Sequence, residues 1–174
     1  PGWFYHDSED SLVKSVSQLL DLYYNSVGHN ANLLLNFPVN LEGRIPSIDS
    51  AFAAEWHQTL QHEFSNNLLK TCRITANNTR SRRFGPKQVL NEEYTSYWAT
   101  EDGVTHSELI FEFPEPTRFN RLMLQEYIPL GQNVEAFYLD CFKNGKWLPI
   151  EVDEPLTTIG YKRLVRFQTV EADK

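Results

Sequence analysis

The sequence predicts a chain in two parts, an α/β segment followed by an all-β segment. Apolar residues recur at helical spacing before residue 65 and alternate in short runs after it. Residues 1–64 hold two bases, Lys14 and Arg44, against eight acids, a net of −6, whereas residues 65–174 hold 14 bases and 15 acids, a net of −1. The polar stretch Ser65-Asn66-Asn67 lies between them. We therefore expect one domain at residues 1–65 and a second at residues 66–174.

The composition excludes several classes of protein. The chain has 174 residues, of which 41% are hydrophobic and 13% aromatic, and this excludes wholesale disorder. A net charge of −7 without basic clusters argues against nucleic acid and anionic membrane surfaces as partners. No apolar run approaches the ~20 residues of a membrane span. Cys72 and Cys141 allow one disulfide or two buried thiols, and the second is favoured.

The first helix is predicted by an apolar stripe between residues 12 and 27. The stripe consists of Leu12, Val16, Leu19, Leu20, Tyr23 and Val27. Asp7 or Ser8 is expected to cap its start, because acidic and hydroxyl side chains accept hydrogen bonds from the first helical amides. Gly28 is expected just past its end.

A short buried strand and a second helix are expected next. The run Leu33-Leu34-Leu35 is typical of a strand that is covered on both faces in a parallel sheet. Ser47 is expected to cap the second helix, whose apolar stripe is Phe52, Trp56, Leu60 and Phe64. Because a parallel strand needs neighbours on both sides and the chain offers none of that character, we expect the tail end of a larger α/β domain.

The pattern of residues 66–174 predicts a β-sandwich. The expected strands are Leu69–Thr75, Ser107–Phe113, Arg118–Ile128, Val134–Lys143, Lys146–Ile150 and Thr158–Phe167. Asn144-Gly145 between two apolar runs predicts a hairpin. Short strands with such turns favour an antiparallel sandwich. Because the pattern stops soon after the last strand, we expect the sandwich to lack its last strands and the chain to be incomplete at both ends.

No residue pattern by itself identifies a reaction. The sequence has no phosphate loop, no metal-spaced Cys/His cluster and no nucleophile elbow, so neither a cofactor nor a metal site is expected. His57 and His62 are five apart, which is not the spacing of a helical zinc pair. They are interpreted as solvated helix residues.

Several motifs resemble those of family 29 (GH29) α-L-fucosidases of bacteria. Pro1–His6 (Pro-Gly-Trp-Phe-Tyr-His), Leu19–Gly28 and Asn30–Pro38 resemble the end of the catalytic barrel, in the order and at the spacing of the family. Leu90–Thr100 and Glu108–Phe113 resemble the discoidin-like (F5/8 type C, carbohydrate-binding-module-like) domain that follows it. The resemblance implies the last elements of a (β/α)8-like barrel and then a jelly-roll sandwich.

The resemblance also implies a function, a retaining glycoside hydrolase that removes terminal α-L-fucose from oligosaccharides or glycoconjugates. Such enzymes use an Asp nucleophile and a Glu acid/base, and retention needs the two carboxyl groups about 5 Å apart. In the family both lie upstream of the Gly-Trp-Phe-Tyr-His motif. No catalytic residue is therefore expected in this segment, which alone should be inactive. Asp7, Glu9 and Asp10 have the spacing of a helix start instead.

The resemblance implies that Trp3 binds substrate. The family places a Trp from this stretch against fucose, whose methyl and ring C–H groups form an apolar patch that an aromatic face can cover. Such a loop lies at the C-terminal end of a barrel strand, where barrel active sites are built. His6 and Asn36 are further substrate-binding candidates at the same rim, with hydrogen bonding within the loop as the simpler interpretation.

The remaining expectations concern the sandwich, the partners and the location. Trp98 is expected to pack beneath the loops, and Arg80, Arg82 and Arg83 to be solvated or to pair with acids on the barrel helices. The rest of the same enzyme is the expected protein partner, and a periplasmic or secreted location is expected from the family. The alternative function is a non-catalytic carbohydrate-binding or structural sandwich module, against which the barrel-like first part argues.

Overall fold

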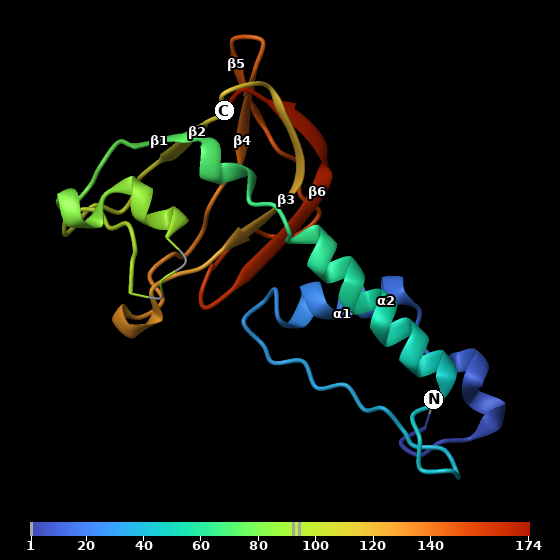
Figure 1. Ribbon diagram of the computed structural model, residues 1–174. Coiled ribbons are helices and arrows are strands. Elements are labelled where there is room, and N and C mark those ends of the chain that lie inside the picture. The colour runs from blue at the N-terminus through green and yellow to red at the C-terminus, as the bar shows by residue number, and fades with distance from the viewer. Residues whose placement is uncertain (1, 92, 94) are drawn as a thin grey trace. The chain divides into compact units, whose positions relative to one another are not determined.

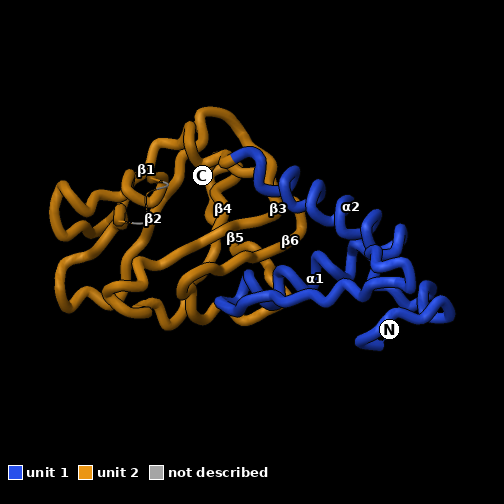
Figure 2. The backbone as a smooth tube through the Cα atoms, turned by 60° about the horizontal axis from the view of Figure 1, so that its bottom comes forward, with its two compact units in different colours: residues 1–66 blue, residues 67–174 orange. Residues whose placement is uncertain are grey.

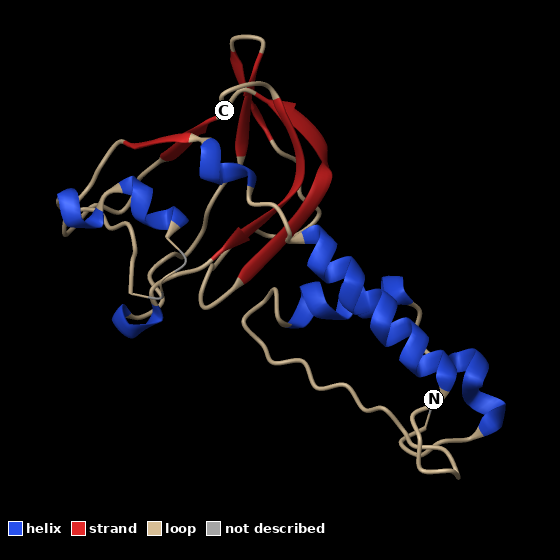
Figure 3. Ribbon diagram, viewed as in Figure 1, coloured by secondary structure: helices blue, strands red, loops and turns tan. Residues whose placement is uncertain are grey.

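The computed structural model describes residues 2–91, 93 and 95–174 as a mixture of helices and strands (Figure 1; Figure 3). Pro1, Glu92 and Tyr94, which belong to motifs quoted above, lie outside the described residues. The chain forms two compact units, Pro1–Asn66 and Asn67–Lys174 (Figure 2). The division falls within the polar stretch at residues 65–67.

Helix α1 spans Val16–Ser26 and begins later than expected. The Ser15 hydroxyl accepts a hydrogen bond from the Gln18 amide (3.3 Å), and the Gln18 side chain accepts one from the Ser15 amide (3.0 Å). This reciprocal capping box satisfies two amides that a helix end leaves free. Residues Asp7–Leu12 form a separate 3₁₀ helix. The prediction of Asp7 or Ser8 as the cap of the first helix is therefore wrong.

Helix α2 spans Ser47–Glu63, close to the predicted position. Pro46 occupies the capping position and Ser47 is the first helical residue, with no capping hydrogen bond from a side chain. The prediction that Ser47 caps the helix is therefore wrong by one position, because the Pro46 carbonyl already accepts the first helical hydrogen bond, from the Ser50 amide (3.0 Å). His57 and His62 are both exposed on α2, as expected for solvated residues.

Unit 1 is held together by aromatic contacts between α1 and α2. Tyr24 is 3% exposed, its hydroxyl donates to a Glu63 carboxylate oxygen (2.9 Å), and its ring stacks on Phe64 with centroids 6.2 Å apart. Tyr23 meets Trp56 edge-on at 6.2 Å. A buried phenol with a hydrogen-bond partner contributes both apolar area and a fixed orientation. These contacts make the two helices a pair.

The segment at residues 32–38 is extended but is not a strand, and Figure 3 draws it as a loop. No backbone hydrogen bond links it to the rest of the described chain. Leu33 and Leu35 face an apolar groove on the helix pair, whereas Leu34 is 91% exposed. The prediction of a strand buried on both faces is therefore wrong for this structure. A strand needs hydrogen-bonded neighbours, and no described strand runs beside this one.

Unit 2 contains six strands among its described residues, in three antiparallel pairs. They are β1 (Arg73–Ala76), β2 (Leu109–Glu112), β3 (Thr117–Leu124), β4 (Asp140–Lys143), β5 (Lys146–Pro149) and β6 (Arg163–Ala172), paired β1–β2, β3–β6 and β4–β5. Each predicted strand overlaps one of these, with displaced ends. The first predicted strand is shorter in the structure because its first residues form a 3₁₀ helix, Leu68–Thr71. The Asn67 side chain caps this helix by accepting a hydrogen bond from the Leu69 amide (3.1 Å).

The pair β3–β6 forms the centre of unit 2. On β6, Leu164 and Val165 are 1% and 0% exposed. Beyond β6, Asp173 donates to the Phe142 carbonyl on β4 and the Phe142 amide donates to the Lys174 carbonyl, both at 2.8 Å. The prediction that the last strand ends at Phe167 is wrong, because pairing with β3 continues to Ala172.

The hairpin β4–β5 confirms the Asn-Gly prediction. Asn144 and Gly145 have φ values of 53° and 77°. Positive φ at both central residues is the requirement of the two-residue turn that matches strand twist. The register Asp140↔Pro149 to Lys143↔Lys146 follows from it.

Cys72 and Cys141 are both free thiols, as the favoured interpretation predicted, but only Cys141 is buried, whereas Cys72 is half-buried. Burial raises the pKa of the Cys72 thiol above its usual value. Across the described residues, no helix combines the length and the apolar character needed to cross a bilayer.

Candidate functional site around Trp3

Trp3 lies in a bend before the 3₁₀ helix of unit 1, and its side chain is 70% exposed. Phe4 beside it is exposed as well. An aromatic ring open to solvent offers its face to an apolar patch of a ligand, such as the C–H groups of a sugar. Among the three predicted site residues, Trp3 is the one whose exposure suits direct contact through a ring face.

The 3₁₀ helix Asp7–Leu12 anchors the backbone just before Trp3. The Gly2 amide donates to a Glu9 carboxylate oxygen at 2.6 Å. The Glu9 amide in turn donates to the His6 carbonyl at 2.9 Å. Glu9 therefore links the two ends of the loop that carries Trp3.

Asn36 contacts the same loop from a distant part of the sequence. Its side-chain amide nitrogen donates to the Trp3 carbonyl at 3.0 Å. The structure thus brings two of the predicted site residues together. His6 is exposed and precedes the 3₁₀ helix as its capping residue, and its backbone carbonyl accepts the hydrogen bond from the Glu9 amide.

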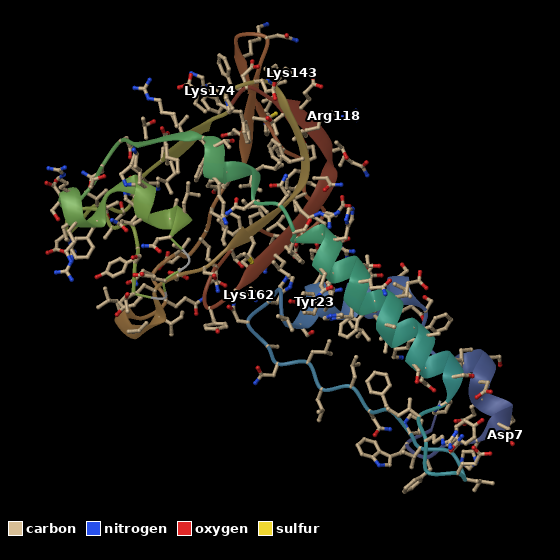
Figure 4. All side chains as sticks on the ribbon, in the orientation of Figure 1. Asp7, Tyr23, Arg118, Lys143, Lys162 and Lys174 are labelled. Carbon is tan, nitrogen blue, oxygen red and sulfur yellow. The ribbon has the colours of Figure 1, made fainter. Side chains whose placement is uncertain are left out.

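Two acidic side chains act on Tyr5, a residue that the sequence did not single out. A hydrogen bond with Asp7, aided by desolvation and by the charge of Asp10, raises the pKa of Tyr5 to about 12. Burial and the charge of Asp10 also raise the pKa of the Asp49 carboxyl above its usual value. Asp7 is labelled in Figure 4, at the start of the 3₁₀ helix. The acidic residues therefore form part of the local structure around Trp3.

An apolar groove of about 380 Å³ lies on the helix pair of unit 1. It is lined by Tyr23, Val27, Leu33, Leu35, Phe37 and Trp56. Figure 4 labels Tyr23 on α1. The lining carries no carboxyl, imidazole or thiol group. Within the described residues, no cluster of three His, Cys, Asp or Glu side chains is arranged to hold a metal ion.

In unit 2, Trp98 is half-buried and its indole N–H donates to the Asn78 carbonyl (3.0 Å), which fits the expected structural role. Arg80 pairs with Asp102 of the same unit, and Arg83 lies 5.6 Å from the centre of the Phe84 ring. The expectation that this basic cluster is solvated or pairs with acids on the barrel helices therefore needs correction for Arg80. Asp102 lies within reach because Arg80 is bound to the segment just before it: the Arg80 amide donates to the Ala99 carbonyl (2.8 Å) and its guanidinium to the Thr100 carbonyl (3.2 Å).

The sequence did not predict an aromatic stack in unit 2. Phe84 and Tyr97 have ring centres 5.0 Å apart, and Tyr97 and Tyr127 stack at 4.4 Å. These residues come from three separate segments, and no local spacing signals their proximity. Because the ring faces of Tyr97 are used within the stack, the cluster is a packing feature.

Comparison with known proteins extends over both units. α-L-Fucosidase 1 of Arabidopsis thaliana is 40% identical over 98% of this chain. A crystal structure of a Bacteroides thetaiotaomicron protein assigned as an α-L-fucosidase matches 99% of this chain with a TM-score of 0.95 and 39% identity, over 38% of that protein. A Ruminococcus gnavus GH29 fucosidase in complex with fucose matches 99% of the chain with a TM-score of 0.88 and 28% identity, over 34% of that protein.

These matches show which enzymes the chain is similar to and how much of their length it covers. No protein-family model matches the sequence. The chain spans 33% and 34% of the curated plant relatives, about a third of their length. Plant and bacterial proteins both occur among the relatives, so a bacterial origin stays a prediction. Over nearly its whole length the chain corresponds to a portion of family 29 α-L-fucosidases, about a third of their length.

Proposed function

We propose that the protein containing this chain is an α-L-fucosidase, a retaining glycoside hydrolase that removes terminal α-L-fucose from glycans. The observation that carries the proposal is the 39–40% identity to α-L-fucosidases over 98% of the chain, across both of its units. The fucose complex of the R. gnavus relative supports a fucosylated glycan as substrate. The bond cleaved would be the glycosidic bond of terminal fucose, with water as the co-reactant.

We further propose that unit 1 is the C-terminal part of a (β/α) barrel and that unit 2 is a discoidin-like β-sandwich. Two features support this. In unit 1, Leu33, Leu35 and Phe37 face the helix pair while Leu34 points away, which is the alternation of a strand that helices cover on one side. In unit 2, three antiparallel pairs and a tight hairpin are typical of sandwiches.

The role of this segment in the enzyme is to contribute Trp3 to the fucose-binding site. Its exposed ring and its place on a loop are the features that support this role. His6 and Asn36 are candidates at the same rim, although the Asn36 amide already donates to the Trp3 carbonyl. The nucleophile and acid/base belong to the rest of the polypeptide in this proposal, which makes the rest of the enzyme the partner of unit 1.

A non-catalytic carbohydrate-binding or structural module is the competing function. It would rest on unit 2 alone, whereas the similarity to fucosidases includes unit 1 as well. Binding of glycans by residues 67–174 in the absence of the rest of the protein would favour the module. A periplasmic or secreted location is part of the proposal and is checked by the sequence upstream of residue 1.

The proposal is tested by assaying the full-length protein and this 174-residue chain with an aryl α-L-fucoside. We expect turnover by the full-length protein and none by the chain alone. In the full-length protein, Trp3→Ala should lower kcat/KM by the equivalent of about 1–3 kcal/mol, the scale of one aromatic contact to the sugar. Trp98→Phe is the matched control, because its indole donates within unit 2. An inactive full-length protein would overturn the assignment, and an unchanged kcat/KM of Trp3→Ala would remove Trp3 from the site.

A further inference from the structure

The backbone around Trp3 is fixed at two points by side chains from different parts of unit 1. Glu9 accepts a hydrogen bond from the Gly2 amide at 2.6 Å, just before Trp3. Asn36 donates to the Trp3 carbonyl at 3.0 Å, just after the Trp3 α-carbon. The two hydrogen bonds therefore bracket the α-carbon from which the indole projects.

This bracketing matters because most of the indole surface is open to solvent. The Trp3 side chain is 70% exposed, and Phe4 beside it is exposed too. An exposed side chain on a loop pays an entropic penalty when a ligand immobilises it, and anchoring its backbone beforehand reduces that penalty. The position of the Trp3 α-carbon, and with it the direction in which the side chain leaves the main chain, is thus held by these polar anchors.

Asn36 is suited to this role by its place in the extended segment at residues 32–38. Leu35 and Phe37, its neighbours on either side, line the apolar groove on the helix pair. Successive side chains of an extended chain point to opposite sides, so Asn36 projects away from that groove. The apolar anchors on one side thereby set where the amide group stands on the other.

We propose that Asn36 is a positioning residue for Trp3, acting through the hydrogen bond from its side-chain amide to the Trp3 carbonyl. Glu9 accepts the hydrogen bond from the Gly2 amide just before Trp3. We call these two hydrogen bonds, from Asn36 and to Glu9, the clamp. The inference rests on the proposed function, in which the Trp3 ring contacts fucose. It gives Asn36 a role in holding the binding surface in place of a direct contact with the sugar.

The test measures competitive inhibition by free L-fucose in the full-length protein, with an aryl α-L-fucoside as reporter substrate. Asn36→Asp is isosteric, but its ionised carboxylate cannot donate to a carbonyl. We expect it to raise the inhibition constant of L-fucose by about three- to tenfold, a change that corresponds to roughly 0.7–1.4 kcal/mol. Asn36→Gln keeps an amide donor and should restore part of the loss. Asn32→Asp, an exposed residue of the same segment, is the matched control and should leave the constant unchanged.

A double-mutant cycle separates positioning from a general structural effect. If Asn36 acts through Trp3, adding Asn36→Asp to Trp3→Ala should cause no further loss. Additive losses would overturn the proposal, as would an unchanged inhibition constant in Asn36→Asp. A full-length protein that neither binds fucose nor turns over the fucoside would instead overturn the proposed function. An effect of Trp3→Ala without an effect of Asn36→Asp keeps that function and removes the clamp.

As a check that needs no activity, ¹⁵N relaxation of the Trp3 backbone amide can be measured in the deuterated full-length protein. Asn36→Asp should increase the nanosecond motion of this amide relative to the wild-type protein and to Asn32→Asp. Equal relaxation in all three proteins would contradict the anchoring that the geometry describes.

Discussion

Unit 1 and unit 2 differ in how completely they bury their apolar side chains and pair their backbone hydrogen-bonding groups. Unit 2 encloses Leu164 and Val165 completely, and its strands exchange hydrogen bonds up to the last residue, Lys174. Unit 1 buries Leu19 and Tyr24 between its helices but leaves Leu34 91% exposed, on an extended segment without backbone partners in the described chain. Apolar side chains and peptide groups left open in this way favour association with further structure. Within the described residues, unit 2 therefore buries and pairs more of its own groups than unit 1 does.

The largest expected consequence concerns independent folding. A fragment of residues 67–174 should unfold in one cooperative thermal transition, whereas a fragment of residues 1–66 should lack one, because few of its side chains are buried. In the whole chain, hydrogen exchange should protect the β6 amides about a thousandfold more than the amides of residues 32–38. Circular dichroism and exchange mass spectrometry measure the two. A cooperative transition of residues 1–66 alone, or equal protection, would erase the contrast between the units.

A second contrast is between single apolar side chains of the two units. Val165→Ala on β6 should lower the free energy of unfolding by about 1–3 kcal/mol, because it leaves a cavity in a closed core. Leu34→Ala in the same chain should change it by less than about 0.5 kcal/mol, since the side chain is already in water. Chemical denaturation of both variants gives the values. A larger loss for Leu34→Ala would mean that the exposed segment is covered in solution.

In both units, the elements that the sequence could predict are those that local signals specify. The hairpin at Asn144-Gly145 and the helix at Ser47–Glu63 depend on local turn chemistry and on helical periodicity, so their prediction is confirmed. The start of α1 was missed because the Ser15–Gln18 capping box competes with the earlier acidic residues. At Leu33–Leu35 the sequence predicted burial on both faces, whereas in the structure Leu34 is exposed. Whether this segment forms a strand depends on neighbours that local sequence does not specify.

For the candidate site, the sequence motif identified Trp3 and Asn36, and the structure connects them through one hydrogen bond. That contact joins residues 33 positions apart and could not be read from either motif. Tyr5, with its raised pKa, was missed because its effect depends on the side chains of Asp7 and Asp10 folding back toward it. The stack of Phe84, Tyr97 and Tyr127 was missed for the same reason, since three distant segments form it.

A third prediction concerns a loop anchor of unit 2 that resembles the polar anchors of unit 1. The Glu126 carboxylate accepts from the amides of Asn133 (2.7 Å), Val134 (2.9 Å) and Gly160 (2.5 Å). Glu126→Ala leaves three amides without this acceptor and should lower the free energy of unfolding by about 1.5–3 kcal/mol. Glu135→Ala, an exposed acid nearby in sequence, is the control and should have little effect. Denaturation curves measure both, and equal small effects would show that water replaces the carboxylate freely.

The smallest expected effects concern two titrating groups whose pKa values are raised for different reasons. In unit 1, the hydrogen bond with Asp7 is the main cause that raises the pKa of Tyr5 to about 12, from the usual 10.0. In unit 2, burial raises the pKa of the Cys72 thiol. For Tyr5 the folded state holds its proton more tightly than the unfolded state. Its contribution to stability is therefore complete below pH 10.0 and is lost as the pH rises toward 12. Cys72 has the same sign, with the loss above the usual thiol pKa.

Asp7→Asn should distinguish the two causes. It removes the carboxylate that holds the Tyr5 proton, so the pKa of Tyr5 should fall toward 10.0, whereas the pKa of Cys72 should stay raised because burial is unaffected. Titration of ¹³C-labelled tyrosines by NMR follows Tyr5, with Tyr5→Phe to assign its signal. The pH dependence of alkylation in a Cys141→Ser chain follows Cys72. A Tyr5 pKa that remains near 12 in Asp7→Asn would show that desolvation and Asp10, and not the hydrogen bond with Asp7, govern this residue.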